Sequence, residues 1–374
     1  MNEKKVLENA YCIAQTIDNG TIDAQIIENV DVLIAKIDNN KSLVSALTTS
    51  LVKKIIYPQQ DVRLHRTDFE GGYSARVLDT QFTSPFFKEK FPRYANKESA
   101  FLTLATRERI KWSKEEGNNL KIRDVKLKNA FLNIFEQIEA NEIKPEHCLY
   151  YLFSQLIKLS VQNEAIFKLV EKPISGIVNI ATVIHILEEH FASKQSSRLP
   201  VIAIYSMYEI LLPITTRYKH KILLPLQVHT ASDKHGFGDI EICEQDGTPF
   251  ESVEIKHNIP IDKYLIFDIV KKIRNNPIKR YYILTTYKNS FIDTATEKET
   301  NEYILQIKSQ NGIDIIANGI ITTLKYYLRF IDDYTLFIET YTKNLIEDAK
   351  KSTEVKDFHI IECAEILHTY QLSL

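Results

Sequence analysis

Three carboxylates and one ammonium occupy alternate positions in two short stretches, and this spacing is typical of metal-assisted chemistry. The first stretch carries Asp239 and Glu241, and the second carries Glu254 and Lys256. Alternate side chains of a strand point to the same face, so two paired strands would gather all four groups. Neighbouring carboxylates resist being ionised together, and a divalent cation such as Mg2+ removes that conflict because it prefers carboxylate oxygens.

Two carboxylates beside a lysine form the pattern of a metal-dependent phosphodiesterase. The carboxylates hold a metal that polarises the phosphate and lowers the pKa of a bound water. The lysine orients or activates that water and offsets charge in the transition state. We therefore expect Asp239, Glu254 and Lys256 to be catalytic, with Asp239 and Glu254 as metal ligands. Glu241 is a further candidate ligand. The plainer alternative is a solvated hairpin with ordinary surface charges.

Residues 239–243 and 252–256 are the strands that would position these groups. The intervening segment 244–247 contains Asp246-Gly247, a hairpin turn signal. Isoleucines and a valine alternate with the charged residues in both strands, so the opposite face is apolar. We expect an antiparallel hairpin with one buried face and one charged face.

The flanking segments predict a small α/β (α+β) core around this hairpin. An apolar helix covers 201–212, and Glu209 is its only acid. Glu209 is a further candidate metal ligand, although it would equally suit a solvated helix edge. A strand at 221–229 precedes the hairpin, and a helix at 263–274 and a buried strand at 280–286 follow it. The predicted order is αβββαβ.

These residues and this order resemble the PD-(D/E)xK nucleases. Asp239 is followed fifteen positions later by Glu254-x-Lys256, and Gly238 stands where the family pattern has proline. The resemblance implies the restriction-endonuclease-like fold, Mg2+ as cofactor and hydrolysis of DNA phosphodiesters.

A second block, 59–135, has the composition of a DNA-contacting surface. It contains the sequence GGYSAR at 71–76, then SPFFKEKFP and ESAFLT. Glycines let backbone approach a ligand, and arginine donates to phosphates or to guanine edges. The alternative is a tight surface turn. The candidate DNA-binding residues are Arg63, Arg66, Tyr73, Ser74, Arg76, Arg107 and Arg109 as base readers, and Lys88, Lys90 and Lys97 as phosphate contacts.

This block is similar to one found in SacI-type restriction endonucleases, over roughly residues 60–290. The resemblance implies a type II restriction endonuclease that cuts a short sequence in double-stranded DNA. It also implies a homodimer, because a palindromic site is read by a two-fold protein. A cognate DNA methyltransferase would be its functional partner. Two alternatives stay open: another PD-(D/E)xK nuclease in repair or junction resolution, and a catalytically inactive DNA-binding relative.

Length and charge set wider bounds. The 374 residues carry a net charge of -2, which argues against a non-specific nucleic-acid binder. Segment 59–130 nevertheless holds 15 Lys/Arg against 10 Asp/Glu, whereas 290–374 holds 8 against 14. Basic charge is thus displaced away from the C-terminus, as a one-sided DNA cleft requires.

We expect four segments. They are an N-terminal helical segment at 1–58, a mostly helical DNA-recognition region at 59–195, the nuclease core at 196–290 and a C-terminal helical extension at 291–374. No apolar stretch or N-terminal leader suggests a membrane or export, so we expect a cytoplasmic protein. The four separated cysteines are expected to be reduced core thiols.

Overall fold

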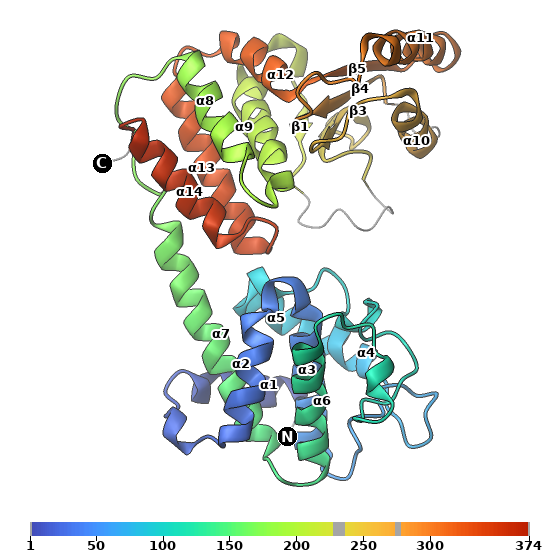
Figure 1. The fold of residues 1–374 in the computed structure, drawn as a ribbon, viewed down its shortest axis with the longest axis vertical. Helices are drawn as coiled ribbons and strands as arrows, with labels where there is room; N and C mark the ends of the chain where they lie inside the picture. Colours follow the sequence, from blue (N-terminus) through green and yellow to red (C-terminus); the bar gives the residue numbers. More distant parts are fainter. Residues whose placement is uncertain (1, 227–235, 274–277, 373–374) are drawn as a thin grey trace. The chain divides into compact units, whose positions relative to one another are not determined.

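The computed structural model describes residues 2–226, 236–273 and 278–372, and it divides into two compact units. One unit comprises Met1–Ala165 with Lys350–Thr353, and the other comprises Ile166–Ala349 with Glu354–Leu374. The described part of the first unit is built of helices, and the second combines helices with one sheet (Figure 1). The protein is therefore of the mixed α+β class. The boundary between the units lies inside the segment 59–195 that we expected as one region.

The first unit is assembled from amphipathic helices at the positions that their apolar spacing predicts. Its three opening helices occupy the 3–56 region. A loop separates the first two, and Lys36 alone separates the second from the third. Two long helices follow the irregular block at 57–124. The helices are α1 (Glu3–Ala14), α2 (Ala24–Ala35), α3 (Ile37–Ile56), α4 (Ala75–Leu78), α5 (Ser84–Lys90), α6 (Val125–Glu139) and α7 (Pro145–Phe167).

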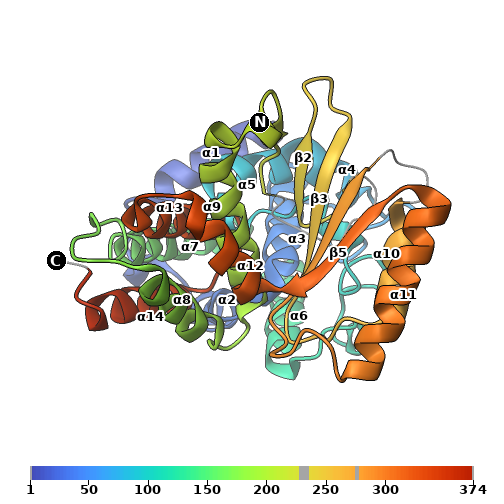
Figure 2. The same ribbon diagram turned by 90° about the horizontal axis from the view of Figure 1, so that it is seen from above.

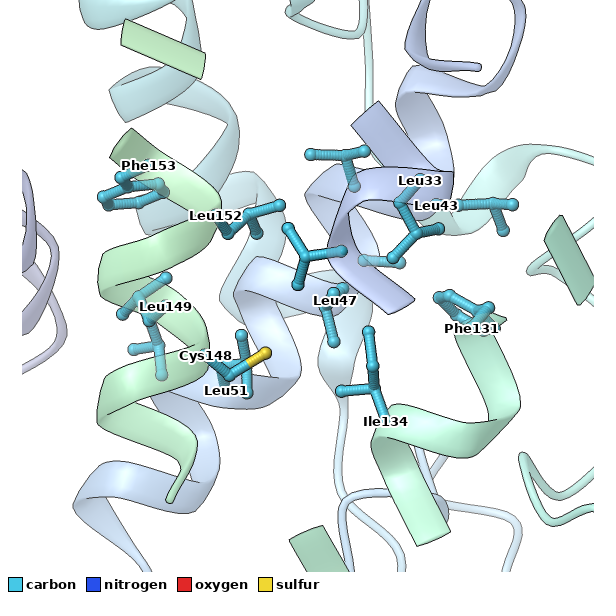
Figure 3. Packing of buried hydrophobic residues seen from close by; sticks show 14 of the residues in the cluster. Leu33, Leu43, Leu47, Leu51, Phe131, Ile134, Cys148, Leu149, Leu152 and Phe153 are labelled. Carbon is cyan, nitrogen blue, oxygen red and sulfur yellow. The ribbon is translucent and has the colours of Figure 1, made fainter. Parts of the chain in front are cut away.

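Leucines and aromatic residues from α2, α3, α6 and α7 form the centre of this unit (Figure 3). Leu47 of α3, Phe131 of α6 and Leu152 of α7 are each fully buried. Burying such a side chain contributes roughly 1.5–3 kcal/mol, so this apolar core is the main stabilising feature inside the first unit.

A buried carboxylate ties the irregular block to this helical core. Asp79 accepts hydrogen bonds from the Ser99 hydroxyl at 2.7 Å, from the amide of Ala100 at 2.8 Å and from the Ser45 hydroxyl at 3.1 Å. Burial raises the pKa of Asp79. These bonds hold the loop that follows α5 against α3, so Asp79 is a structural residue of the first unit.

The second unit surrounds a five-stranded sheet in the order β1-β2-β3-β4-β5. β1 and β2 are antiparallel to their neighbours, and β3, β4 and β5 run parallel. The strands are β1 (Ile222–Leu223), β2 (Ile240–Cys243), β3 (Pro249–Lys256), β4 (Arg280–Thr285) and β5 (Asp314–Gly319). The helices are α8 (Ile180–Phe191), α9 (Leu199–Ile214), α10 (Lys263–Ile273), α11 (Thr294–Asn311), α12 (Ile320–Tyr327), α13 (Tyr334–Lys351) and α14 (Asp357–Thr369).

Helices cover both faces of the sheet (Figure 2). Tyr281 and Ile283 of β4 pack against α10 and α11 on one face. Ile240 of β2 and Val253 of β3 pack against α9 and α12 on the other. The sheet therefore has a buried layer on each side. A polar group also lies within one layer: Glu251 of β3 is fully buried and accepts hydrogen bonds from Tyr208 and Tyr218.

The sheet extends further along the chain than the sequence indicated. The order α9, β1, β2, β3, α10, β4 is present, but β5 then pairs with β4 over six residues. The predicted core at 196–290 therefore lacks two elements. The segment expected as a helical extension supplies both: the strand β5, and α12, which packs on the sheet. The strand predicted at 221–229 is only two residues long in β1, and residues 227–229 lie outside the described residues.

Two other expectations need correction. By length and composition alone, Ser196–Ile214 would suit a membrane span, although 67% of its apolar window is buried inside the protein. Burial of α9 against the sheet explains its apolar composition as that of a core helix, which is consistent with a soluble protein.

Cys148, Cys243 and Cys363 are buried free thiols, but Cys12 is exposed on α1.

Candidate active site

The two strands of the β2–β3 hairpin bring their charged residues together as the alternation predicts. Ile240 pairs with Val253 and Glu241 with Ser252, so Asp239 lies where the ladder reaches Glu254. The Asp239 carboxylate accepts a hydrogen bond from the amide of Ile255 at 2.7 Å. Asp239 is thereby fixed against the backbone between Glu254 and Lys256.

The lysine of the motif is in direct contact with its acidic neighbour. The Lys256 ammonium donates to Glu254 at 2.6 Å. Lys272, in the last turn of α10, places its ammonium 3.9 Å from the other oxygen of Glu254. Two cations therefore flank one half-buried carboxylate, and an anion bound there would meet both.

Gly238 is required by close packing at the start of β2. A Cβ atom at this position would lie 2.7 Å from the carbonyl oxygen of Val253 and 3.3 Å from the hydroxyl of Tyr281. The Tyr281 hydroxyl donates to the carbonyl of Phe237 at 2.5 Å and lies 3.3 Å from Glu254. Glycine at 238 and the tyrosine of β4 together fix the loop from which Asp239 projects.

The electrostatics of Asp239 are those of a crowded anionic site. Burial and then the charge of Glu254 raise the pKa of Asp239, while the Ile255 amide and the charges of Lys256 and Arg198 act in the opposite sense. Burial, followed by the charges of Glu254 and Asp239, also raises the pKa of Tyr281 well above its usual value. Extra positive charge between Asp239 and Glu254 would relieve this repulsion, which is what a bound divalent cation supplies.

The further carboxylates expected as metal ligands do not join this pair. Glu241 shares the face but is buried, and it accepts hydrogen bonds from the backbone amides of Phe237 and Gly238. Glu209 accepts from Asn344 at 2.7 Å and lies 3.5 Å from the ammonium of Lys343, both on α13. The α9 helix packs on the opposite side of the sheet, which explains why Glu209 does not reach Asp239.

Asp239 and Glu254 alone remain as candidate metal ligands. Within residues 2–226, 236–273 and 278–372, no group of three or more His, Cys, Asp or Glu side chains could hold a metal ion. Two carboxylates nevertheless fit Mg2+, which keeps several waters and is usually held by one or two carboxylates plus substrate phosphate oxygens.

The glycine-rich loop of the first unit closes on itself rather than presenting Tyr73. A Cβ at Gly72 would lie 2.0 Å from the carbonyl oxygen of Arg66, and Gly71 has φ of 71°. Tyr73 is buried and its hydroxyl donates to Ser50 at 3.0 Å. Tyr73 is therefore a core residue, contrary to our expectation that it reads bases. Ser74 is the residue that immediately precedes α4.

Several of the candidate cations are held by partners within the first unit. Arg63 pairs with Asp61 and with Glu136 at 3.0 Å, and Arg66 pairs with Asp68 at 2.9 Å. Three other candidates also have partners. Arg109 donates to the Asp68 carbonyl, Lys88 donates to the Lys97 carbonyl, and Lys90 pairs with Glu8 and Glu89.

Arg76 and Arg107 differ from these. Both are exposed, and within the described residues neither guanidinium has an ion pair or a hydrogen bond. An exposed guanidinium without a partner retains its full donor capacity for a ligand.

No protein-family model matches this chain, and no curated protein sequence matches it. Inferences about function therefore depend on the residues and contacts described above.

Sequence reasoning missed two residues at the candidate site. Tyr281 belongs to β4, whose sequence is RYYILT. Pairing with β3 puts Tyr281 on the same face of the sheet as Glu254. The sequence of β4 alone does not show that β3 is its neighbour. Lys272 is one of two adjacent lysines at the end of α10, and only the packing of that helix shows which of them faces Glu254.

Proposed function

We propose that this protein is a Mg2+-dependent nuclease of the PD-(D/E)xK class that cuts double-stranded DNA. The observation that carries the proposal is the cluster of Asp239, Glu254 and Lys256 at one end of the β2–β3 hairpin. Its support is threefold: the spacing of the motif, the hydrogen bond from the Ile255 amide to Asp239, and the contact of Lys256 with Glu254.

Each residue has a definite task in phosphodiester hydrolysis. Asp239 and Glu254 would hold Mg2+, which polarises the phosphate and activates water when bound. Lys256 supplies a positive charge that offsets charge on the phosphoryl oxygens in the transition state. Tyr281 and Gly238 act on geometry, because they fix the loop that carries Asp239.

Within this class we propose a type II restriction endonuclease. The resemblance carried by the 59–135 block supports this, as does the size of the helical first unit, which exceeds what the chemistry needs. Arg76 and Arg107 are the proposed base readers, because arginine bonds bidentately to guanine and these two are exposed and unpaired in the described structure. A homodimer and a cognate methyltransferase follow from the same resemblance, and sedimentation velocity with and without DNA tests the dimer.

A panel of substrates tests the proposal against its alternatives. The purified chain is incubated with Mg2+ and a long duplex of known sequence, a four-way junction or single-stranded DNA. We expect discrete fragments from the long duplex only, with every end mapping to one short sequence. Preferential resolution of the junction would favour a junction nuclease. Tight binding without cleavage of any substrate would favour an inactive relative.

A further inference from the structure

A cavity of about 520 Å³ opens in the second unit at the carboxyl ends of the three parallel strands. β3 ends at Lys256, and His257, the next residue, lines the cavity. Thr285 of β4 pairs with Lys256, Gly319 of β5 pairs with Thr285, and both Thr285 and Gly319 line the cavity. The cavity thus begins one residue after the candidate catalytic lysine, outside the carboxyl ends of the strands, where open α/β sheets bind their ligands.

The walls of this cavity combine one cation, several hydroxyls and an apolar side. Lys288 is exposed in the turn after β4, and within the described residues it has no ion pair. Phe191 and Ile320 form apolar surface, and Glu188 on α8 contributes one carboxylate. A volume in this range suits a small molecule, whereas a single inorganic ion would leave most of it unfilled.

The loops that line the cavity are held in place before any ligand arrives. The Thr286 hydroxyl accepts a hydrogen bond from the Asn258 amide at 2.8 Å and lies 3.1 Å from Nδ1 of His257. The Thr285 hydroxyl donates to the carbonyl of Ile259 at 2.6 Å. These bonds tie the segment after β3 to the end of β4, so the cavity is a built feature of the sheet edge.

We propose that this cavity binds one unstacked nucleotide of the substrate strand, adjacent to the scissile phosphate, with a phosphate at Lys288. This rests on the proposed nuclease function. The strand would run from Asp239, Glu254 and Lys256 past His257 into the cavity. The apolar wall takes the base, Glu188 accepts from its amino or imino groups, and the hydroxyls contact the sugar.

Binding of a deoxynucleoside 5′-monophosphate by the full-length chain tests this without any cleavage. Calorimetric titrations in EDTA use dAMP or dGMP, the matching deoxynucleosides and inorganic phosphate. We expect the monophosphate to bind more tightly than either fragment. Lys288→Ala should weaken its binding at least about tenfold, the loss expected for a charged hydrogen bond. Lys325→Ala, on the same unit but outside the cavity lining, should leave binding unchanged.

A filling variant separates this cavity from other binding surfaces. Ala192 is exposed and lines the cavity, so Ala192→Trp occupies its space without removing a polar side chain. We expect this variant to lose monophosphate binding, while Ala295→Trp on exposed α11 keeps it. Unchanged binding by Ala192→Trp, or phosphate binding as tightly as the nucleotide, would overturn the proposal.

The same variants distinguish failure of this inference from failure of the nuclease proposal. If wild-type protein cuts DNA and Ala192→Trp cuts it equally fast, the nuclease stands and the nucleotide site is wrong. If Ala192→Trp abolishes monophosphate binding but wild-type protein cuts no DNA with Mg2+, the cavity binds nucleotides and the nuclease proposal fails. We expect Ala192→Trp to slow cleavage at least tenfold while circular dichroism stays that of wild type.

Discussion

The amide of Ile255 donates to the carboxylate of Asp239 at 2.7 Å, which joins the start of β2 to the end of β3. Because Ile255 stands between Glu254 and Lys256, this bond holds Asp239 next to the other two motif residues. The contact also occupies one lone pair of the Asp239 carboxylate, so the other lone pairs are left to accept hydrogen bonds or to bind a metal. The positions of Asp239 and Glu254 thus follow from the register of the β2–β3 hairpin. Small changes at the base of the hairpin should therefore displace them.

Gly238→Ala should damage the site through packing alone. The added Cβ would meet the Val253 carbonyl at 2.7 Å, so the loop carrying Asp239 has to move. We expect a loss of about 1–3 kcal/mol in stability, as for other overpacked sites, together with at least tenfold slower cleavage. Chemical denaturation and initial cleavage rates measure the two effects. Gly20→Ala is the matched control, because its Cβ meets nothing closer than 3.4 Å; equal behaviour of the two variants would refute the packing argument.

Lys272→Ala should slow cleavage by roughly tenfold, because its ammonium lies 3.9 Å from Glu254 and would face a bound phosphate. Lys271→Ala changes the adjacent, exposed lysine of the same helical turn and should have little effect. Single-turnover cleavage rates at saturating enzyme separate this effect from binding. If the two variants are slowed alike, the cation acts by general electrostatic attraction and has no specific place at the site.

The grouping of the candidate catalytic residues was predictable from sequence because it depends on local rules. Strand alternation places Asp239, Glu254 and Lys256 on one face, and the Asp246-Gly247 turn, with Gly247 at φ 85°, fixes the hairpin. The start of α10 was equally readable, since Asp262 accepts from the Leu265 amide at 2.8 Å as a helix cap.

Long-range packing was not predictable in the same way. Glu209 was expected as a metal ligand. It is not one of the clustered carboxylates because α9 packs on the other face of the sheet, and the sequence does not show on which face a helix packs. The prediction that Tyr73 reads bases was wrong for a related reason. The partner of its hydroxyl, Ser50, lies 23 residues away on α3. The fifth strand lies in the segment expected as a helical extension, and its pairing with β4 requires knowledge of the whole sheet.

Arg76→Ala and Arg63→Ala should affect DNA binding in different ways. Arg76 is exposed, so its loss should weaken the cognate complex by roughly 1–3 kcal/mol and leave binding to random DNA unchanged if it reads a base. Arg63 is held by Asp61 and Glu136, so its loss should lower stability with little change in affinity of the folded protein. Anisotropy titrations with cognate and random duplexes measure affinity. Equal weakening of both complexes by Arg76→Ala would identify a phosphate contact.

Stability of the second unit should fall in mild acid because of His190. Its Nδ1 lies 2.9 Å from the Tyr341 hydroxyl and its Nε2 lies 2.9 Å from the His359 carbonyl. Burial lowers the pKa of His190 to about 4. The unfolded chain therefore binds a proton below pH ~6.5 that the folded chain does not, and stability decreases from there towards pH 4, by on the order of 3 kcal/mol.

Urea denaturation followed by circular dichroism at several pH values measures this slope. His190→Gln removes the titrating ring, so its unfolding free energy should be lower at pH 7 but should change less between pH 6.5 and 4.5. Carboxylates titrate in both proteins, and the difference between them isolates the histidine. Parallel pH profiles for the two proteins would show that His190 does not contribute.

The most direct measurement is cleavage of a mapped duplex by wild-type protein, Asp239→Asn, Lys256→Ala and Glu209→Gln in Mg2+. Binding to the same duplex is followed in parallel in Ca2+. The account predicts Mg2+-dependent cutting by wild type and by Glu209→Gln, because Glu209 pairs with α13. It predicts at least a thousandfold loss for Asp239→Asn and Lys256→Ala with DNA affinity kept. Cleavage that persists in both of those variants, or wild-type protein that cuts no duplex in Mg2+, would contradict the account.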